Sequence, residues 1–413
     1  MEFNIVSIIG LGYIGLPTAA MIASRGIEVI GVDVSEHAVN TINRGEIHIV
    51  EPELDILVRG AVSTGRLRAT LTPESADAFM VAVPTPFKEN LQPNLDYIEA
   101  AAKAIAPVLK KGNLVILEST SPVGTTEKLA GWLAEARPDL TFPQQTGNTA
   151  DIKIAYCPER VLPGRIIHEL VENDRIIGGL TEQCAEVAKE FYAVFVRGER
   201  LITNARTAEM SKLTENSFRD VNIAFANELS IICDKLKINV WELIRLANHH
   251  PRVNILNPGP GVGGHCIAVD PWFIVSSVPE EAKMISLARN INDGKPKYVV
   301  DQVVQAANQF KHPIIACLGL AFKADIDDLR ESPAMNITAD LADLNIGEVL
   351  AVEPNIQKLP ESLAQKGVKL VNTKEAIEQA NTIVVLVDHR DFKKLPKDTF
   401  NTKLVIDTRG VVN

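Results

Sequence analysis

The chain has 413 residues and a formal net charge of −10. This length exceeds what one hydrophobic core normally serves, so it predicts two or three domains. The acidic balance, with a sequence pI near 5.4, argues against general nucleic-acid binding, which needs a basic face. Five cysteines without a C-x-x-C pair indicate a reducing compartment, without a disulfide framework or a zinc ribbon. We therefore expect a cytoplasmic protein that binds neither nucleic acid nor membrane and holds no metal.

The amino-terminal segment is rich in glycine and free of charge. Residues 3–24 contain no charged residue, yet Glu2 stands where a signal peptide carries basic residues. Two apolar runs flank a glycine turn and a helical run to about Arg25: Val6–Ile9, then Gly10-Leu11-Gly12-Tyr13-Ile14-Gly15, then Glu28–Val32. In a dinucleotide-binding unit such glycines permit the turn, the approach of pyrophosphate and close helix packing. Asp33 follows the second run and is placed to bind the adenosine ribose, which predicts NAD rather than NADP.

Polar residues follow three further strand-like runs. The runs are Phe79–Val83, Leu114–Leu117 and Ile152–Tyr156. Doubly wound sheets bind their ligands beyond the carboxyl ends of the strands, although hydroxyl groups there could equally cap helices. The candidate residues are Thr85, Glu118, Thr120, Thr126, Glu159 and Arg160.

The middle of the chain predicts one long helix from Arg206 to about Leu236, because glycine and proline are absent from it. Lys212, Asn216 and Arg219 stand at i, i+4 and i+7, which places them on one helical face. Such a stripe is often a solvated face. The apolar residues on the rest of the circumference instead favour a helix buried between domains or subunits, where a lysine must be paired or functional. A second helix is expected at Val240–Ala247.

Cys266 stands in the glycine-rich segment 261–271, GVGGHCIAVDP, with Asp270 four residues later. Glycines let a backbone approach a ligand closely, so we interpret Cys266 as a nucleophile. The alternative is a buried cysteine that acts as a small hydrophobe. That alternative suits the four cysteines in apolar runs, which are Cys157, Cys184, Cys233 and Cys317.

The last third predicts a second, smaller open sheet. Its strand-like runs are Ile314–Leu318, Val349–Val352, Thr382–Val387 and Leu404–Ile406. Lys323 and Arg330 follow the first of them and are either surface charges or anion contacts. The whole pattern predicts an α/β fold with two Rossmann-like doubly wound domains joined by a long central helix.

Six ordered motifs make the chain resemble the UDP-glucose/GDP-mannose dehydrogenase family. They are the glycine fingerprint, Ser119–Thr125, Pro158-Glu159, Lys212–Asn216, Gly263–Cys266 and Phe322–Ser332. The resemblance implies an NAD-binding Rossmann domain over 1–204 and a central helical region over 205–308 that carries the cysteine loop and forms a homodimer. A Rossmann-like domain that binds a UDP-sugar is implied over 309–413.

The family reaction is a four-electron oxidation of a sugar C6 alcohol to a carboxylate with two NAD, which the resemblance links to cell-surface polysaccharide synthesis. Within the family, three segments resemble the members that oxidise UDP-N-acetyl-D-mannosamine: Tyr156–Gly164, Asn216–Glu228 and His250–Asn254. UDP-glucose members typically have an acid–glycine pair where this chain has Pro163-Gly164. UDP-N-acetylglucosamine and UDP-glucose remain alternative substrates.

The resemblance also assigns roles to single residues. Cys266 would carry a thiohemiacetal and then a thioester, Lys212 and Asn216 would hold the oxyanion, and Glu159, Asp270 and Thr120 would complete the catalytic set. The implied cofactor contacts are Gly10, Gly12, Tyr13, Ile14, Gly15, Asp33, Thr85, Glu118, Thr126 and Arg330. The implied substrate contacts are Arg160, Val161, Lys212, Asn216, Arg219, His250, Arg252, Gly263 and Lys323.

Two other functions fit parts of this pattern. A hydroxyacid dehydrogenase would make one hydride transfer and would need no thiol. A regulatory module would bind NAD without turnover. Two, one or no NADH formed per sugar separates the three possibilities.

Overall fold

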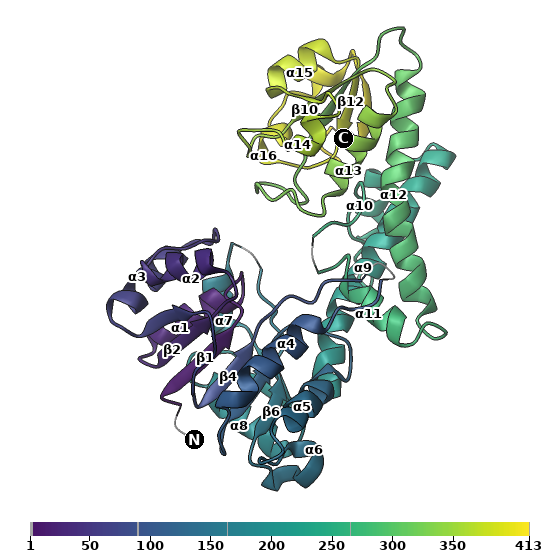
Figure 1. Cartoon of the computed structure of the whole chain (residues 1–413). Helices are drawn as coiled ribbons and strands as arrows, with labels where there is room; N and C mark the ends of the chain where they lie inside the picture. Colours follow the sequence, from purple (N-terminus) through teal and green to yellow (C-terminus); the bar gives the residue numbers. More distant parts are fainter. Residues whose placement is uncertain (1–2, 89–90, 163, 265, 413) are drawn as a thin grey trace. The chain divides into compact units, whose positions relative to one another are not determined.

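The computed structural model describes residues 3–88, 91–162, 164–264 and 266–412 (Figure 1). The chain divides into two compact units, Met1–Thr214 and Glu215–Asn413. Each unit contains one sheet with helices on both faces, which confirms the predicted α/β class with two Rossmann-like domains and a long central helix. The three-part division at residues 204 and 308 stays a prediction.

The sheet of the first unit has eight strands in the order β3-β2-β1-β4-β5-β6-β7-β8. Its strands are β1 (Ile5–Ile9), β2 (Glu28–Val32), β3 (Leu67–Thr70), β4 (Ala78–Val81), β5 (Leu114–Leu117), β6 (Lys153–Tyr156), β7 (Arg175–Gly179) and β8 (Arg200–Asn204). The pair β6 and β7 is antiparallel, and the other pairs are parallel. The chain order reverses beside β1, which places the ends of β1 and β4 at a topological switch point.

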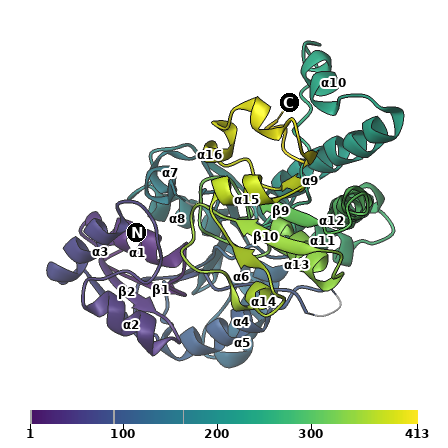
Figure 2. The same cartoon turned by 90° about the horizontal axis from the view of Figure 1, so that it is seen from above.

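Helices cover both faces of this sheet (Figure 2). One face packs on α1 (Gly15–Ser24), α2 (Glu36–Asn43), α3 (Leu54–Ser63), α7 (Ile166–Glu172) and α8 (Glu182–Tyr192). The other packs on α4 (Asp96–Ile105), the 3-10 turn η1 (Ala106–Val108), α5 (Thr125–Ala136) and α6 (Pro143–Thr146), which η2 (Gly147–Thr149) follows. The nearly continuous apolar runs of β1 and β5 follow from this burial on two faces.

The central helices are α9 (Ala205–Leu236), α10 (Val240–Ala247), α11 (Asp270–Ser277) and α12 (Lys283–Ala307). The predicted long helix is thus confirmed to within one residue. In the second unit, a buried polar network ties α12 to α9: Arg289 pairs with Asp220 at 2.5 Å, and Asn292 binds both Asp220 and Asn227. Every charge in that network has a partner, as burial requires.

The sheet of the second unit is wholly parallel, in the order β11-β10-β9-β12-β13. The strands are β9 (Ile314–Leu318), β10 (Glu348–Val352), β11 (Lys369–Leu370), β12 (Thr382–Val385) and β13 (Leu404–Asp407). Helices α12, α13 (Pro333–Asp343) and α14 (Glu361–Ala364) cover one face. The other face packs on α15 (Thr373–Gln379), α16 (Arg390–Lys393) and η3 (Lys397–Phe400).

Among the described residues, no helix combines the length and the apolar character needed to cross a membrane.

Candidate active site

The first glycine turn joins β1 to α1. Gly10 has a φ of 93°, and its N–H donates to the Val32 carbonyl at 2.8 Å. A Cβ on Gly15 would lie 1.8 Å from the Gly10 carbonyl oxygen, so only glycine permits this approach of helix and turn. Nothing lies within 4 Å of the position that a Gly12 Cβ would occupy. The turn is therefore closed on its inner side and open at Gly12.

Asp33 lies directly after β2 and faces this turn. Its Oδ2 accepts the Leu11 N–H and its Oδ1 accepts the Ser35 N–H, both at 2.9 Å. The two bonds fix the carboxylate, and each oxygen keeps lone pairs for a further donor. This arrangement suits two ribose hydroxyls.

The N-terminus of α1 fits the diphosphate of NAD. The helix has no side-chain cap and no acidic residue in its first turn, so its positive end is available to an anion. Tyr13 is exposed and Ile14 half-buried beside the open Gly12. These residues, with Asp33, would hold the cofactor.

The polar residues at the ends of β4 and β5 bind one another. The Thr85 hydroxyl donates to the Thr120 carbonyl at 2.5 Å. The Thr126 hydroxyl and N–H both donate to the Glu209 carboxylate, at 2.6 and 2.8 Å. Thr120 is half-buried. The predicted catalytic role of Thr120 and the predicted cofactor contacts of Thr85 and Thr126 all remain predictions.

Two buried carboxyl groups, Glu118 and Glu159, lie within the electrostatic influence of the Arg175 guanidinium. Arg175 pairs with Glu159 at 2.6 Å, while Glu118 accepts the Tyr192 hydroxyl at 2.7 Å. The other Glu118 oxygen has no hydrogen-bond partner among the described residues. Burial and the charge of Glu159 raise the pKa of Glu118 to about 7, against the opposing effects of Arg175 and Tyr192. Glu118 is therefore a buried acid that is largely neutral below that pH.

Lys212, Asn216 and Arg219 all lie in the continuous helix α9. Lys212 is half-buried, Asn216 is buried and Arg219 is exposed. No hydrogen bond or ion pair holds the Lys212 ammonium group within the part of the chain that the structure describes. The lysine is thus available to a ligand.

Cys266 is exposed, while the other four cysteines are buried. Its carbonyl accepts the N–H of Val269 and of Asp270, which forms the turn into α11. The Asp270 carboxylate is buried and accepts the Asn216 amide at 2.5 Å. The second unit therefore brings together three predicted catalytic residues, Cys266, Asp270 and Asn216.

The glycines before Cys266 pack against the second unit's own sheet domain. A Cβ on Gly263 would lie 2.5 Å from the Glu331 carbonyl oxygen and 2.7 Å from Pro333. Gly264, with a φ of 84°, lies against the Phe322 ring. The close approach that the glycines permit is therefore an approach to the loop after β9.

The remaining predicted contacts are dispersed. His250, Arg252, Lys323 and Arg330 are exposed, and Arg330 pairs with Asp328 at 2.7 Å. Arg160 is half-buried and donates to the Asp174 carbonyl, and Val161 beside it is half-buried. Pro163 lies outside the described residues.

The structure adds three residues that the sequence reasoning missed: Glu209, Arg175 and Arg409. Arg409 lies two residues after β13, is half-buried, and has its guanidinium close to Gly259. A charged residue two positions after a strand was the available signal for Arg409. No sequence signal separated Glu209 from the solvent-facing acids of a long helix.

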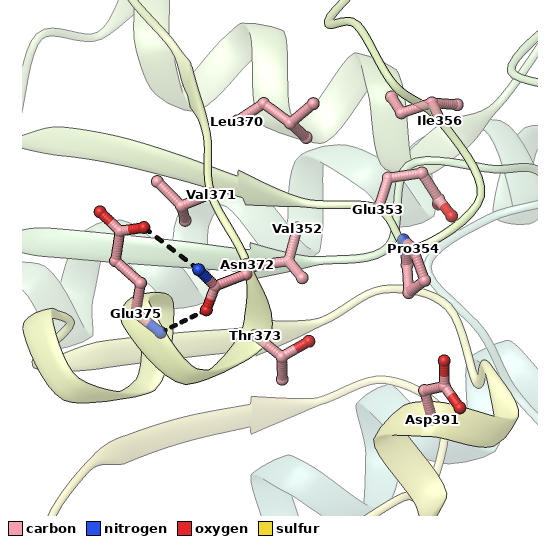
Figure 3. A pocket seen from close by; sticks show the side chains of 10 residues that line it. All are labelled: Val352, Glu353, Pro354, Ile356, Leu370, Val371, Asn372, Thr373, Glu375 and Asp391. Carbon is pink, nitrogen blue, oxygen red and sulfur yellow. Dashed lines mark hydrogen bonds between the residues drawn. The ribbon is translucent and has the colours of Figure 1, made fainter.

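A hollow of about 530 Å³ lies at the carboxyl ends of β10 and β11 (Figure 3). Its polar lining includes Glu353, Asn372, Glu375 and Asp391, and neither lysine nor arginine lines it. A lining with three carboxyl groups and neither lysine nor arginine does not suit a diphosphate.

The fold and the two sites define an oxidoreductase that uses NAD. Models of the UDP-glucose/GDP-mannose dehydrogenase family match along the chain: the NAD binding domain at residues 4–196, the central domain at 206–294 and the UDP binding domain at 316–413. The chain belongs to this family. It is an NAD-dependent UDP-sugar dehydrogenase, as its sequence predicted.

Curated relatives match over the whole length. An NDP-N-acetyl-D-galactosaminuronic acid dehydrogenase of Ralstonia nicotianae is 64% identical, covering 100% of this chain and 97% of the relative. A UDP-N-acetyl-D-mannosamine dehydrogenase of Campylobacter jejuni is 65% identical, covering 96% and 98%. Among solved structures, the UDP-D-ManNAc dehydrogenase of Pyrococcus horikoshii is 39% identical with a TM-score of 0.88, covering 99% of this chain and 96% of that one.

Proposed function

We propose that this chain oxidises UDP-N-acetyl-D-mannosamine at C6 to UDP-N-acetyl-D-mannosaminuronate, for cell-surface polysaccharide synthesis in the cytoplasm. The balance is one alcohol, two NAD and one water to one carboxylate, two NADH and three protons. The observation that supports this proposal is the exposed Cys266, whose carbonyl accepts the N–H of Asp270, together with the buried Asp270–Asn216 hydrogen bond.

Cys266 supplies the covalent step. Its sulfur would add to the C6 aldehyde and hold that carbon first as a thiohemiacetal and then, at the higher oxidation level, as a thioester. Water would release the carboxylate and regenerate the thiol. Holding the aldehyde on the protein prevents its escape between the two oxidations.

Fixed donors and acids complete the site. Lys212 and the Asn216 amide would stabilise the oxyanion at C6, a role for preorganised donors. Asp270 orients Asn216, and Glu159, held by Arg175, would position the water with Thr120. NAD, when bound at α1 and Asp33, supplies hydride acceptance.

The substrate contacts are assigned by charge and position. Arg160, Val161, Arg219, His250, Arg252, Gly263 and Lys323 would contact the sugar nucleotide, and Arg330 the cofactor. Since the diphosphate is anionic and the chain carries net charge −10, these local cations would have to hold it.

A homodimer through α9 belongs to the same proposal. Phe218, Phe225 and Ile232 stand seven residues apart on this helix and are 68%, 51% and 44% exposed. An apolar stripe at this spacing suits a second helix. Phe225→Glu should convert a dimer to a monomer in size-exclusion chromatography with light scattering, and a wild-type monomer would contradict the assignment.

A substrate panel tests the sugar. UDP-ManNAc should give the highest kcat/KM, measured as NADH absorbance, against UDP-GlcNAc, UDP-GalNAc, UDP-glucose and GDP-mannose. The relative named for N-acetyl-D-galactosaminuronic acid makes UDP-GalNAc the second candidate. A better rate with UDP-GalNAc or UDP-GlcNAc would overturn the choice of epimer, and a better rate with UDP-glucose would overturn the acetamido sugar itself.

A further inference from the structure

Glu209 lies in the second turn of α9 and is wholly buried. Its carboxylate accepts three hydrogen bonds from the start of α5. The donors are the Gly124 N–H at 2.6 Å, the Thr126 N–H at 2.8 Å and the Thr126 hydroxyl at 2.6 Å. A long-range contact thus joins two elements more than eighty residues apart in the sequence.

This contact fixes one end of the loop that carries Thr120. The loop runs from the end of β5 at Leu117 to the start of α5 at Thr125. Near the loop's beginning, the Ser119 hydroxyl donates to the Val83 carbonyl at 2.7 Å, and Thr85 holds the Thr120 carbonyl. At its far end, Glu209 is the side chain that binds Gly124 and Thr126. The loop is therefore clamped on both sides of Thr120.

Glu209 also lies on the same helix as Lys212. Residues three apart on a helix are neighbours on one face, so Lys212 follows Glu209 by about one turn of α9. A shift of the Glu209 contact would move the Thr120 loop and the Lys212 turn against each other. Geometry between two such groups governs the rate strongly, since misplacement by about 1 Å can cost roughly a hundredfold.

The negative charge of Glu209 suits its place. Gly124 precedes α5, whose N-terminal N–H groups present the positive end of the helix dipole. Burial raises the pKa of Glu209, and the hydrogen bonds from Thr126 and Gly124 oppose that shift. The start of α1 has no side-chain cap and is left open for a diphosphate. At the start of α5, the Glu209 side chain takes the corresponding place.

We propose that Glu209 is a positioning residue that fixes the Thr120 loop against the turn of α9 carrying Lys212. The inference rests on the proposed function, in which Thr120 and Lys212 act at the reacting carbon. The Glu209 carboxylate is wholly buried and binds the start of α5, so we assign it no contact with substrate or cofactor.

The first experiment compares steady-state kinetics of Glu209→Gln with the wild type, using UDP-ManNAc and NAD. The amide would turn an N–H group toward the N–H donors of α5, so kcat should fall by about tenfold to a hundredfold while the KM for NAD stays within about twofold. Thr126→Val keeps the two backbone bonds and should lower kcat in the same direction by less. It serves also if Glu209→Gln does not fold.

A matched control removes a cap that lies elsewhere in the same unit. Thr181 caps α8 by accepting the Cys184 N–H. Thr181→Ala should lower the melting temperature without lowering kcat. A fall in kcat of equal size in this control would show that lost capping alone slows the enzyme and would overturn the inference.

The decisive readout is a double-mutant cycle with Lys212→Ala. If Glu209 acts through Lys212, adding Glu209→Gln to Lys212→Ala should lower kcat by less than about twofold. If Glu209→Gln lowers kcat equally in the wild type and in Lys212→Ala, the inference about Glu209 is overturned. A normal kcat in folded Glu209→Gln and Thr126→Val would overturn it as well, and neither result would contradict the proposed function. A normal kcat in Lys212→Ala would overturn it together with the proposed role of the lysine.

Discussion

The turn after β1 and the turn after β9 are held by the same pattern of hydrogen bonds. Gly10 and Gly319 have φ values of 93° and 96°, and each donates its N–H at 2.8 Å to the last residue of the neighbouring strand. An acid after that neighbour then binds the next N–H of the turn. Asp33 accepts from Leu11 at 2.9 Å, and Glu353 accepts from Leu320 at 2.8 Å.

The two turns differ in the residues that follow these shared hydrogen bonds. In the first, Gly12 and the uncapped start of α1 are left open. In the second, Glu353 also binds Ala321, Asn355 and His389, and α13 starts only at Pro333 behind a Ser332 cap. The longer second loop carries Lys323 and receives the glycines that precede Cys266.

Some residues of this motif hold the turn, and others are expected to bind a ligand. The first glycine and the strand-end acid hold a turn in either setting. The second glycine lets the backbone approach a diphosphate, and the third permits close packing of the helix that follows at once. We therefore expect changes at the first turn to affect the cofactor and changes around the second turn to affect the substrate chemistry.

The largest effect should come from the thiol held beside the second turn. Cys266→Ser should lower uronate formation by roughly a thousandfold or more, because a hydroxyl is a weaker nucleophile and its ester hydrolyses slowly. NAD binding, followed by fluorescence titration, should not change. Cys184→Ala, at a buried cysteine, is the control; near-normal product from Cys266→Ser would refute the covalent step.

A smaller effect is expected at the opening of the first turn. Gly12→Val should raise the KM for NAD by about tenfold to a hundredfold, since the side chain would occupy space that the diphosphate needs. Gly131→Val makes the same change where nothing lies within 4 Å. An unchanged KM in Gly12→Val would show that the open position is not the diphosphate site.

The strand-end acids should differ in their effect on cofactor choice. Asp33→Ala should narrow the preference for NAD over NADP by about tenfold, because it removes a charge that repels a 2′-phosphate. Glu353→Gln should leave the ratio of the two kcat/KM values unchanged. Equal use of both cofactors by the wild type would already contradict the role given to Asp33.

The smallest effects concern stability. Glu118 has a pKa raised to about 7. The free energy of unfolding of the wild type should therefore fall relative to that of Glu118→Gln as pH rises from about 4.5 to 7, by up to roughly 3 kcal/mol.

Burial acts to raise the pKa of Glu353, but the hydrogen bonds from His389 and from the N–H groups of Leu320 and Asn355 lower it. The wild type should therefore be more stable to unfolding than Glu353→Gln above about pH 4.5, and this difference in stability should disappear as pH falls. Urea unfolding at several pH values measures the difference in unfolding free energy between the wild type and each variant. If the two differences change with pH in the same direction, the opposite roles given to Glu118 and Glu353 are refuted.

Much of the fold was predictable because the buried parallel strands are continuous apolar runs. The predicted bounds of β2, β5, β9 and α10 agree with the structure. The strands β3, β7, β8 and β11 were missed. β8 is a polar edge strand that is largely exposed, and β7 ends in two glycines, so neither shows the apolar pattern that marks a strand.

The candidate site was predictable where function depends on local sequence. The glycine turn, Asp33 and the Cys266 loop each occupy one short segment. Contacts between distant segments were not predictable: Glu209 with Thr126, Arg175 with Glu159, and the packing of Gly263 on Glu331 depend on the fold itself. The sequence suggested a ligand for the glycines before Cys266, whereas their neighbours in the structure are protein atoms.

Counting NADH per sugar tests the central claim most directly. With limiting UDP-ManNAc, excess NAD and reaction to completion, absorbance should show two NADH for each sugar consumed, and mass spectrometry should show the uronate with no aldehyde accumulating. One NADH per sugar would mean a single hydride transfer without the thiol. No NADH with any sugar nucleotide of the panel would contradict the proposed oxidation altogether.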